Sequence, residues 1–164
     1  MPLKTDPDTL GFLLSETSRL LRNDFERRIA GIGLDITPGE ARALIYVAAN
    51  DGARQSIIAE RMGVEPMTVC GYIERLERRG LVARRPDPAD KRAKQVHTTD
   101  AADGTIAAIR AEAKRMVEQV QAGLDAESRA LLLAALKHLR GNLLETSGDR
   151  PDALRSLHAG SVEA

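Results

Sequence analysis

The chain has 164 residues, of which 43% are hydrophobic and 29% are charged. That length suits one ordinary globular domain, and the apolar content is too high for a chain that stays disordered. Aromatic residues make up only 2%, so the core has to be built mainly from aliphatic side chains, and an all-β sandwich is disfavoured. Basic and acidic residues balance at 24 each, so any attraction to a polyanion has to be local.

The same composition disfavours several kinds of site. A single cysteine, Cys70, excludes an intramolecular disulfide and a cysteine-based zinc site. The three histidines are too scattered to suggest a metal site, so we expect no metal and no other cofactor. The N-terminal residues lack a signal pattern, and no apolar run approaches the roughly 18 residues that a membrane helix needs. These features are typical of a cytoplasmic protein that does not use a membrane.

The first two predicted elements are helices. Apolar residues at steps of three or four predict a long helix from near Asp8 to Gly31. A second helix is expected to begin at Pro38, where the missing N–H costs nothing. Thr37 and Glu40 have the spacing of a capping box, in which each side chain accepts a hydrogen bond from the other residue's amide.

The next segment has the pattern of a helix-turn-helix followed by a β-hairpin. A short helix is predicted at 55–62, and Gly63 supplies a residue that can take positive φ at a sharp turn. A fourth helix begins at Pro66, with one apolar face and one polar, basic face, and Gly80 ends it. Residues 81–85 and 93–98 then read as two strands joined by a charged tip.

Two further helices complete the chain, from Thr99 to about Ala122 and from about Ala126 to Glu145. The last helix carries more leucines than a monomer's outer helix should expose, which indicates dimerisation. Core packing within one chain is the ordinary alternative for such a stripe. The expected dimerisation residues are Leu10, Leu14, Leu132, Leu136, Leu139 and Leu143.

Charge and geometry together favour DNA as the partner of residues 54–99. Residues 75–94 contain eight basic and three acidic side chains in a neutral protein. A helix fits the major groove and reaches base edges with its first two turns, and an arginine at a hairpin tip can enter a minor groove. A solvated charged face is the ordinary alternative for such a run. The expected base contacts are Pro66, Met67, Thr68, Cys70, Gly71 and Arg75, and the expected phosphate and minor-groove contacts are Arg84, Arg85, Lys91, Arg92 and Lys94, with Asp90 holding Arg92 extended.

Several runs resemble the MarR family of regulators: Met62-Gly63-Val64, Thr68-Val69, the segment 75–84 (RLERRGLVAR) and the segment 90–96 (DKRAKQV). The resemblance spans about residues 9–145. It implies a winged helix-turn-helix repressor, an obligate homodimer held by the first, fifth and sixth helices, and a palindromic operator in double-stranded DNA. It also implies that a small anionic or phenolic ligand, or an oxidant, relieves repression. We expect that ligand between the dimer platform and the DNA-binding lobe, lined from the first, second and fifth helices, with residues that the sequence does not name.

The expected fold class is mainly α with a small β-hairpin wing, a winged helix-turn-helix domain plus a helical dimerisation region. The DNA-binding lobe is assigned to 37–99 and the dimerisation region to 9–36 and 100–145. A flexible arm at 1–8 and a loosely ordered tail at 146–164 complete the chain. Some positions depart from the family pattern: Gly71 stands where a long polar residue is usual, and Arg54 replaces the usual Ser or Thr cap of the third helix.

Other functions were weighed on the same residues. A winged-helix module that binds protein and never DNA is the main alternative, and it predicts association that is insensitive to salt. An enzyme is disfavoured, because the sequence shows no nucleophile–base pair, phosphate-binding glycine loop or metal cluster. Cys70 invites a redox role on the DNA-facing side of the fourth helix, but a small residue without special reactivity is the favoured reading.

Overall fold

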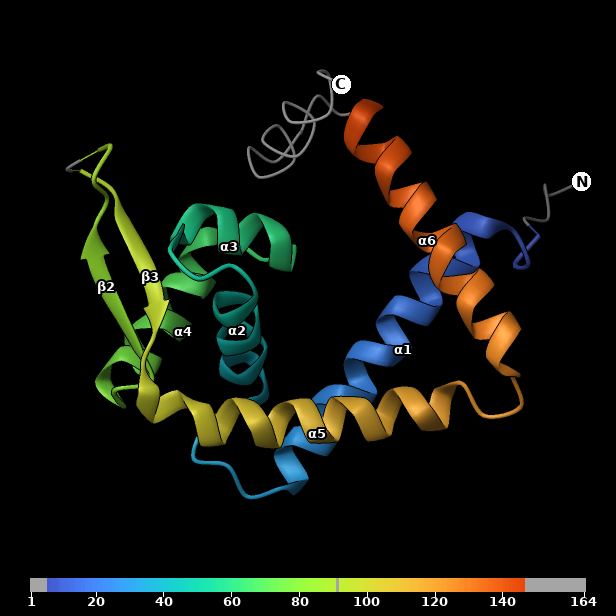
Figure 1. The fold of residues 1–164 in the computed structure, drawn as a ribbon, viewed down its shortest axis with the longest axis horizontal. Helices are drawn as coiled ribbons and strands as arrows, with labels where there is room; N and C mark the ends of the chain where they lie inside the picture. Colours follow the sequence, from blue (N-terminus) through green and yellow to red (C-terminus); the bar gives the residue numbers. More distant parts are fainter. Residues whose placement is uncertain (1–5, 91, 147–164) are drawn as a thin grey trace, which may run out of the picture. The chain divides into compact units, whose positions relative to one another are not determined.

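The computed structural model describes residues 6–90 and 92–146, so the expected N-terminal arm and C-terminal tail lie almost entirely outside the described residues. The chain divides into two compact units, Met1–Gln119 and Val120–Ala164. The first unit contains five α-helices and a small sheet, and the second contains the last helix (Figure 1). The mainly helical fold class with a small antiparallel wing is confirmed.

The first two helices are α1 (Leu10–Gly31) and α2 (Pro38–Ala49). The capping box at the start of α2 is confirmed: the Thr37 hydroxyl accepts from the Glu40 amide, and the Glu40 carboxylate accepts from the Thr37 amide at 2.8 Å. These two contacts satisfy amides that a helix start leaves without partners. The local sequence alone therefore sets where α2 begins.

The helix-turn-helix consists of α3 (Gln55–Met62) and α4 (Pro66–Arg78), with the boundaries that the pattern predicted. Gly63 has φ +61° and ψ 40°, the left-handed conformation that glycine adopts at little cost. The next amide, of Val64, returns to the Ala59 carbonyl at 3.1 Å, which closes the turn tightly. This turn brings α4 against both α2 and α3.

The wing is a sheet of three strands, where the sequence predicted only two. Strands β2 (Val82–Pro86) and β3 (Lys94–Thr98) form the expected hairpin, and β1 (Ala53–Arg54) adds to the other edge of β3 in the order β1-β3-β2. All pairs are antiparallel. A strand of two residues is too short to show the alternation of apolar and polar side chains, so β1 could not be predicted from the sequence. Its effect is to join the start of α3 to the wing.

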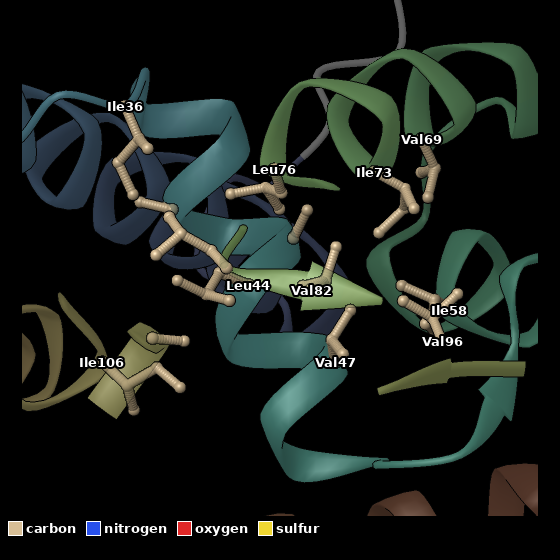
Figure 2. Packing of buried hydrophobic residues seen from close by; sticks show 14 of the residues in the cluster. Ile36, Leu44, Val47, Ile58, Val69, Ile73, Leu76, Val82, Val96 and Ile106 are labelled. Atoms are coloured by element: carbon tan, nitrogen blue, oxygen red, sulfur yellow. The ribbon is translucent and has the colours of Figure 1, made fainter. Parts of the chain in front are cut away.

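An aliphatic core holds α2, α3, α4 and the sheet together, and Figure 2 shows its side chains converging from these elements. Each fully buried Leu, Ile or Val contributes about 1.5–3 kcal/mol relative to an exposed one. The core also receives Ile29 from the end of α1 and Ile106 and Ile109 from α5. Its fully buried large aliphatic residues are Ile29, Leu44, Ile58, Ile73, Leu76, Ile109, Val47, Val69, Val82 and Val96.

A 3-10 turn at Asp100–Ala102 leads from the wing into α5 (Asp103–Val120), where the sequence predicted one continuous helix. A buried carboxylate on α5, that of Glu112, accepts hydrogen bonds from Arg115 and, at 3.2 Å, from Arg28 of α1. The Arg115 hydrogen bond is the main cause that lowers the pKa of Glu112, with Arg28 adding to it and burial opposing it. This network ties the last turn of α1 to α5.

The last helix, α6 (Ala126–Thr146), leaves five of its seven leucines exposed and has no buried residue among those described. Its leucines range from 40% to 67% exposed at Leu131, Leu132, Leu133, Leu136 and Leu143. An amphipathic helix normally buries its apolar stripe, so this surface is unusual for an isolated chain. Among the described residues, none of the helices combines the length and apolar character that crossing a bilayer requires.

Candidate nucleic-acid interface

The N-terminal half of α4 is open to solvent on one side. Val69, Ile73 and Leu76 point into the core, as Figure 2 shows, so the opposite side of the helix faces outward. Met67 is 81% exposed, and Pro66 and Thr68 are also exposed. Three of the six expected base contacts are therefore accessible at the start of the helix.

Cys70 and Gly71 occupy the next turn and are only partly exposed. The Cys70 thiol lies 3.5 Å from the carboxylate of Glu74, one turn along α4. Because Gly71 has no side chain, the helix backbone itself forms the surface there, beside the guanidinium of Arg75. This part of α4 offers little beyond its backbone for recognition.

Arg75 lies differently from the expectation that it contacts bases. Its Nε donates to the carboxylate of Glu40, whose side chain is only 1% exposed. Its guanidinium carbon also stands 5.4 Å from the centre of the Tyr72 ring, a cation–π distance. The Nε of Arg75 thus faces α2, whereas its Nη1 lies beside Gly71, 3.3 Å from the place that a Cβ would take there.

Glu40 has two functions, because the carboxylate that caps α2 also holds α4. Burial would raise its pKa, but the Thr37 amide, the Arg75 hydrogen bond and the Arg79 charge outweigh burial and place the pKa below its ordinary value. Arg79 lies 3.8 Å from the second carboxylate oxygen. The sequence revealed only the capping function, since the partners on α4 are distant along the chain.

Gly39 permits the close approach of α2 and α4. A Cβ at this position would lie 2.5 Å from the Tyr72 hydroxyl oxygen and 2.6 Å from the adjoining ring carbon. Real Cβ atoms do not approach so closely, so any other residue here would displace Tyr72. This requirement leaves no pattern in the sequence, because its signal is a single glycine inside a helix.

In the wing, Arg84 is also held within the protein. Its Nε and Nη2 donate to one carboxylate oxygen of Glu77 at 2.9 and 2.6 Å, and its amide donates to the other oxygen at 3.1 Å. The side chain is 23% exposed, and the Arg84 hydrogen bond is the main cause that lowers the pKa of Glu77. Arg84 thus fastens β2 to α4, and its expected contact with a phosphate stays a prediction.

The other expected cations of the wing lie on its surface. Arg85, Arg92 and Lys94 are all exposed. Lys91, the remaining one, lies outside the described residues. Asp90 was expected to hold Arg92 extended, and its carboxylate accepts a hydrogen bond from the Arg92 amide at 3.0 Å. The contact therefore orients the backbone at the tip of the wing.

Arg54 and Asp87 fasten the wing to the start of α3. The Arg54 Nε donates to the Asp87 carboxylate at 2.6 Å, and the other oxygen accepts from the Ala89 amide at 2.8 Å. Asp87 is 5% exposed, and the Arg54 hydrogen bond is the main cause that lowers its pKa. Arg54 also lies 3.8 Å from the carboxylate of Asp90. The residue that departs from the usual helix cap thus has a structural partner 33 positions away.

A second contact closes the sheet against the end of α2. The Asp51 carboxylate accepts from the Thr98 amide at 2.9 Å and lies 3.0 Å from Nδ1 of His97. The His97 hydrogen bond is the main cause that lowers the pKa of Asp51. No role for His97 could be predicted from sequence, because a lone histidine on a strand carries no pattern.

One open cavity of about 370 Å³ lies beside this assembly. Its lining comes from the loop before α2, the end of α4, the residue that precedes β2, and α5. Of the first, second and fifth helices that were expected to line a ligand site, only α5 contributes. Within residues 6–90 and 92–146, His, Cys, Asp and Glu form no group that could hold a metal ion. The lining residues are Asp35, Ile36, Arg79, Leu81 and Thr105.

Comparisons with known proteins agree on one family. A sequence model of the MarR family matches residues 34–93. An uncharacterized HTH-type transcriptional regulator of Bacillus subtilis, YdgJ, is 31% identical over 104 residues, which are 63% of this chain and 62% of that protein. The chain therefore spans less than two thirds of that relative's length.

Solved structures show the same relationship over more of the chain. The crystal structure of transcriptional regulator PA3341 has a TM-score of 0.71 and 33% sequence identity, covering 84% of this chain and 99% of that one. A structure of BpsR from Bordetella bronchiseptica, a protein whose DNA binding is regulated by 6-hydroxynicotinic acid, has a TM-score of 0.66 and 22% sequence identity, covering 84% of this chain and 97% of that one. At that identity the second likeness concerns the fold alone.

Proposed function

We propose, on the premise that this chain belongs to the MarR family of transcriptional regulators, that it represses transcription by binding a palindromic operator as a homodimer. Family membership makes the chain a regulator with a DNA-binding winged helix, and the relatives named above are regulators rather than enzymes. The dimer, the palindrome, the direction of regulation and the contacting residues form the proposal.

The observation that carries the proposal is the exposed start of α4 beside an exposed cationic wing. In this arrangement Pro66, Met67 and Thr68 face the major groove, and Arg92 at the wing tip faces a minor groove. Arg85 and Lys94 extend from β2 and β3, where they contact phosphates. In this proposal Arg75 and Arg84 support these groups through their ion pairs with Glu40 and Glu77 instead of contacting DNA.

A second copy of the chain is the proposed cover for the exposed leucines. Leu132, Leu136 and Leu143 of α6 are 45%, 40% and 67% exposed, and Leu10 and Leu14 of α1 are 60% and 40% exposed. Burying such side chains against a partner is favourable by about 25 cal/mol per Å² of apolar area, so an interface is the expected outcome. Two lobes would then read half-sites about 34–36 Å apart. Leu139, also expected there, is half-buried.

The cavity beside Arg79 is the proposed effector site. Its volume of about 370 Å³ falls within the range of about 300–1,000 Å³ that is usual for small-molecule sites. An anionic or phenolic molecule there would compete with Asp35 and Glu40 for the Arg79 guanidinium, which lies 3.6 and 3.8 Å from their carboxylates. Because Glu40 also holds Arg75, such a ligand would favour another placement of α4 and weaken DNA binding.

The salt dependence of binding tests the DNA-binding part. Duplexes selected from a random pool are titrated with the protein at several salt concentrations, and a scrambled duplex serves as the reference. We expect log affinity to fall with log salt at about 0.9 per phosphate neutralised. Because each substitution removes one contact from both subunits of the dimer, the slope should shrink by about two for each of Arg85→Gln and Lys94→Gln. Lys114→Gln, at an exposed lysine of α5, is the matched control. Binding without salt dependence would refute the proposal and favour a protein-binding module.

A further inference from the structure

We infer that Met67 makes this protein select thymine, by contact between its side chain and the 5-methyl group of one thymine in each operator half-site. This inference rests on the proposed function, because it requires the start of α4 to enter the major groove. It goes further by naming the base and the chemical group that one side chain recognises.

The first step is the exposure of Met67. It is 81% exposed, more than any other large hydrophobic residue among those described, although it belongs to a helix whose other large apolar side chains are buried or half-buried. It is the second residue of α4, on the same side as Gly71 and Glu74, which follow at four and seven positions. Nothing in the fold requires a long apolar side chain at this place.

The second step is the lack of long hydrogen-bond donors near Met67. Helix α4 contains no Asn, Gln or Lys, and its arginines are Arg75 and Arg78. Arg75 donates to the buried carboxylate of Glu40, and Arg78 lies in the last turn, three turns away from Met67. The first two turns therefore carry no side chain of their own for bidentate recognition of guanine or adenine, and the nearest such donor is the Arg75 guanidinium, whose Nη1 lies beside Gly71.

The third step is the chemistry that remains. Thymine is the base that presents an apolar group, its 5-methyl, on the major-groove edge. The flexible, polarizable thioether of Met67 can adjust to that methyl group, and the exposed Thr68 beside it carries a further methyl and a hydroxyl. Contact would remove the Met67 side chain and the thymine methyl group from water. Apolar burial would then provide the base preference that hydrogen bonds provide in other DNA-binding helices.

Replacing thymine by deoxyuridine tests this inference, because the change removes only the methyl group. The operator is first selected from random duplexes, and each thymine is then replaced in turn, symmetrically in both half-sites. Burying one methyl is worth about 0.8 kcal/mol, or about fourfold in affinity. At one symmetric position the wild-type protein should bind about fourfold less tightly per half-site, hence roughly 15-fold less tightly for the whole operator.

Variants show whether Met67 is responsible. Met67→Ala should bind the thymine and uracil duplexes equally, whereas Met67→Leu should retain the preference for thymine. Ile57→Ala is the matched control, because Ile57 is another exposed apolar residue, on α3, and its loss should leave the preference unchanged. Two results would overturn this inference alone. The wild-type protein could bind the operator tightly without losing affinity at any uracil, or Met67→Ala could lose as much affinity at uracil as the wild-type protein does. Failure of the wild-type protein to bind any duplex would overturn the proposed function as well.

Discussion

Arg75 either holds α4 against α2 through its contact with Glu40 or contacts a DNA base. A double-mutant cycle can distinguish these two roles. The cycle compares the wild-type protein with Glu40→Ala, Arg75→Ala and the double variant. If Arg75 holds α4 against α2, its loss should lower the free energy of unfolding, and the two substitutions should not be additive. If Arg75 reads a base, its loss should instead change the preference among DNA sequences.

The structure sets the size of the effect. Glu40 is fully buried, and Glu40→Ala removes two hydrogen bonds in addition to the longer charge contact with Arg79. Loss of the bond to the Thr37 amide should cost about 1 kcal/mol, as for other helix caps. Loss of the charged bond to Arg75 should cost about 1.5 kcal/mol, the lower end of the usual range, because the Arg75 side chain is 39% exposed and can turn to water. The expected total is about 2.5 kcal/mol, and the coupling between the two positions is about 1.5 kcal/mol.

Urea unfolding followed by circular dichroism measures these free energies. All four proteins need the same concentration, since association contributes to apparent stability. Duplex affinity is measured in parallel, under conditions in which every variant is folded. We expect Arg75→Ala to lose stability and to keep the wild-type ranking of operator sequences.

A coupling energy below about 0.5 kcal/mol, together with a relaxed preference at one base in Arg75→Ala, would refute this reasoning. That result would restore the expectation drawn from sequence, in which the arginine contacts DNA. The contact with Glu40 would then be one that the arginine leaves when DNA binds.

Four further outcomes are expected. The hydrogen bonds of Glu40 hold its pKa in the folded protein below the ordinary value despite burial. The contribution of Glu40 to stability is therefore complete above its pKa in the unfolded chain, about 4.3, and is lost as the pH falls toward the lower pKa of the folded protein. Glu40→Gln should therefore flatten the decline of the melting temperature below about pH 5, and an unchanged decline would contradict this. Gly39→Ala should cost about 1–3 kcal/mol in urea unfolding, because its Cβ would overlap Tyr72, and the cost should nearly vanish when Tyr72→Ala is also present. Arg54→Ala should weaken binding to every duplex in anisotropy titrations, because the wing loses its tie to α3, whereas Arg54→Lys should restore part of the affinity. Leu136→Asp should convert a dimer into monomers in sedimentation velocity, and an unchanged sedimentation coefficient would exclude α6 from the interface.

Patterns of three or four residues predicted most elements of this fold. The capping pair Thr37 and Glu40 located the start of α2, and Gly63 located the turn between α3 and α4. The apolar period of α4 identified the side that is buried, with Ile73 at its centre. These signals are readable because each depends on hydrogen bonds or packing between near neighbours, which the local sequence specifies by itself.

Tertiary structure decided which charged side chains remain available at the candidate interface. From sequence alone, Arg75 and Arg84 resemble other exposed arginines, yet each donates to a carboxylate of a neighbouring element. Strand β1 and the ion pair between Arg54 and Asp87 of the wing could not be predicted from the sequence either. A guanidinium pairs with whichever carboxylate the fold brings near, and for Arg75 and Arg54 that partner is 35 and 33 residues away. Local patterns carry no information on such a distance, so the fold alone selects the pairs.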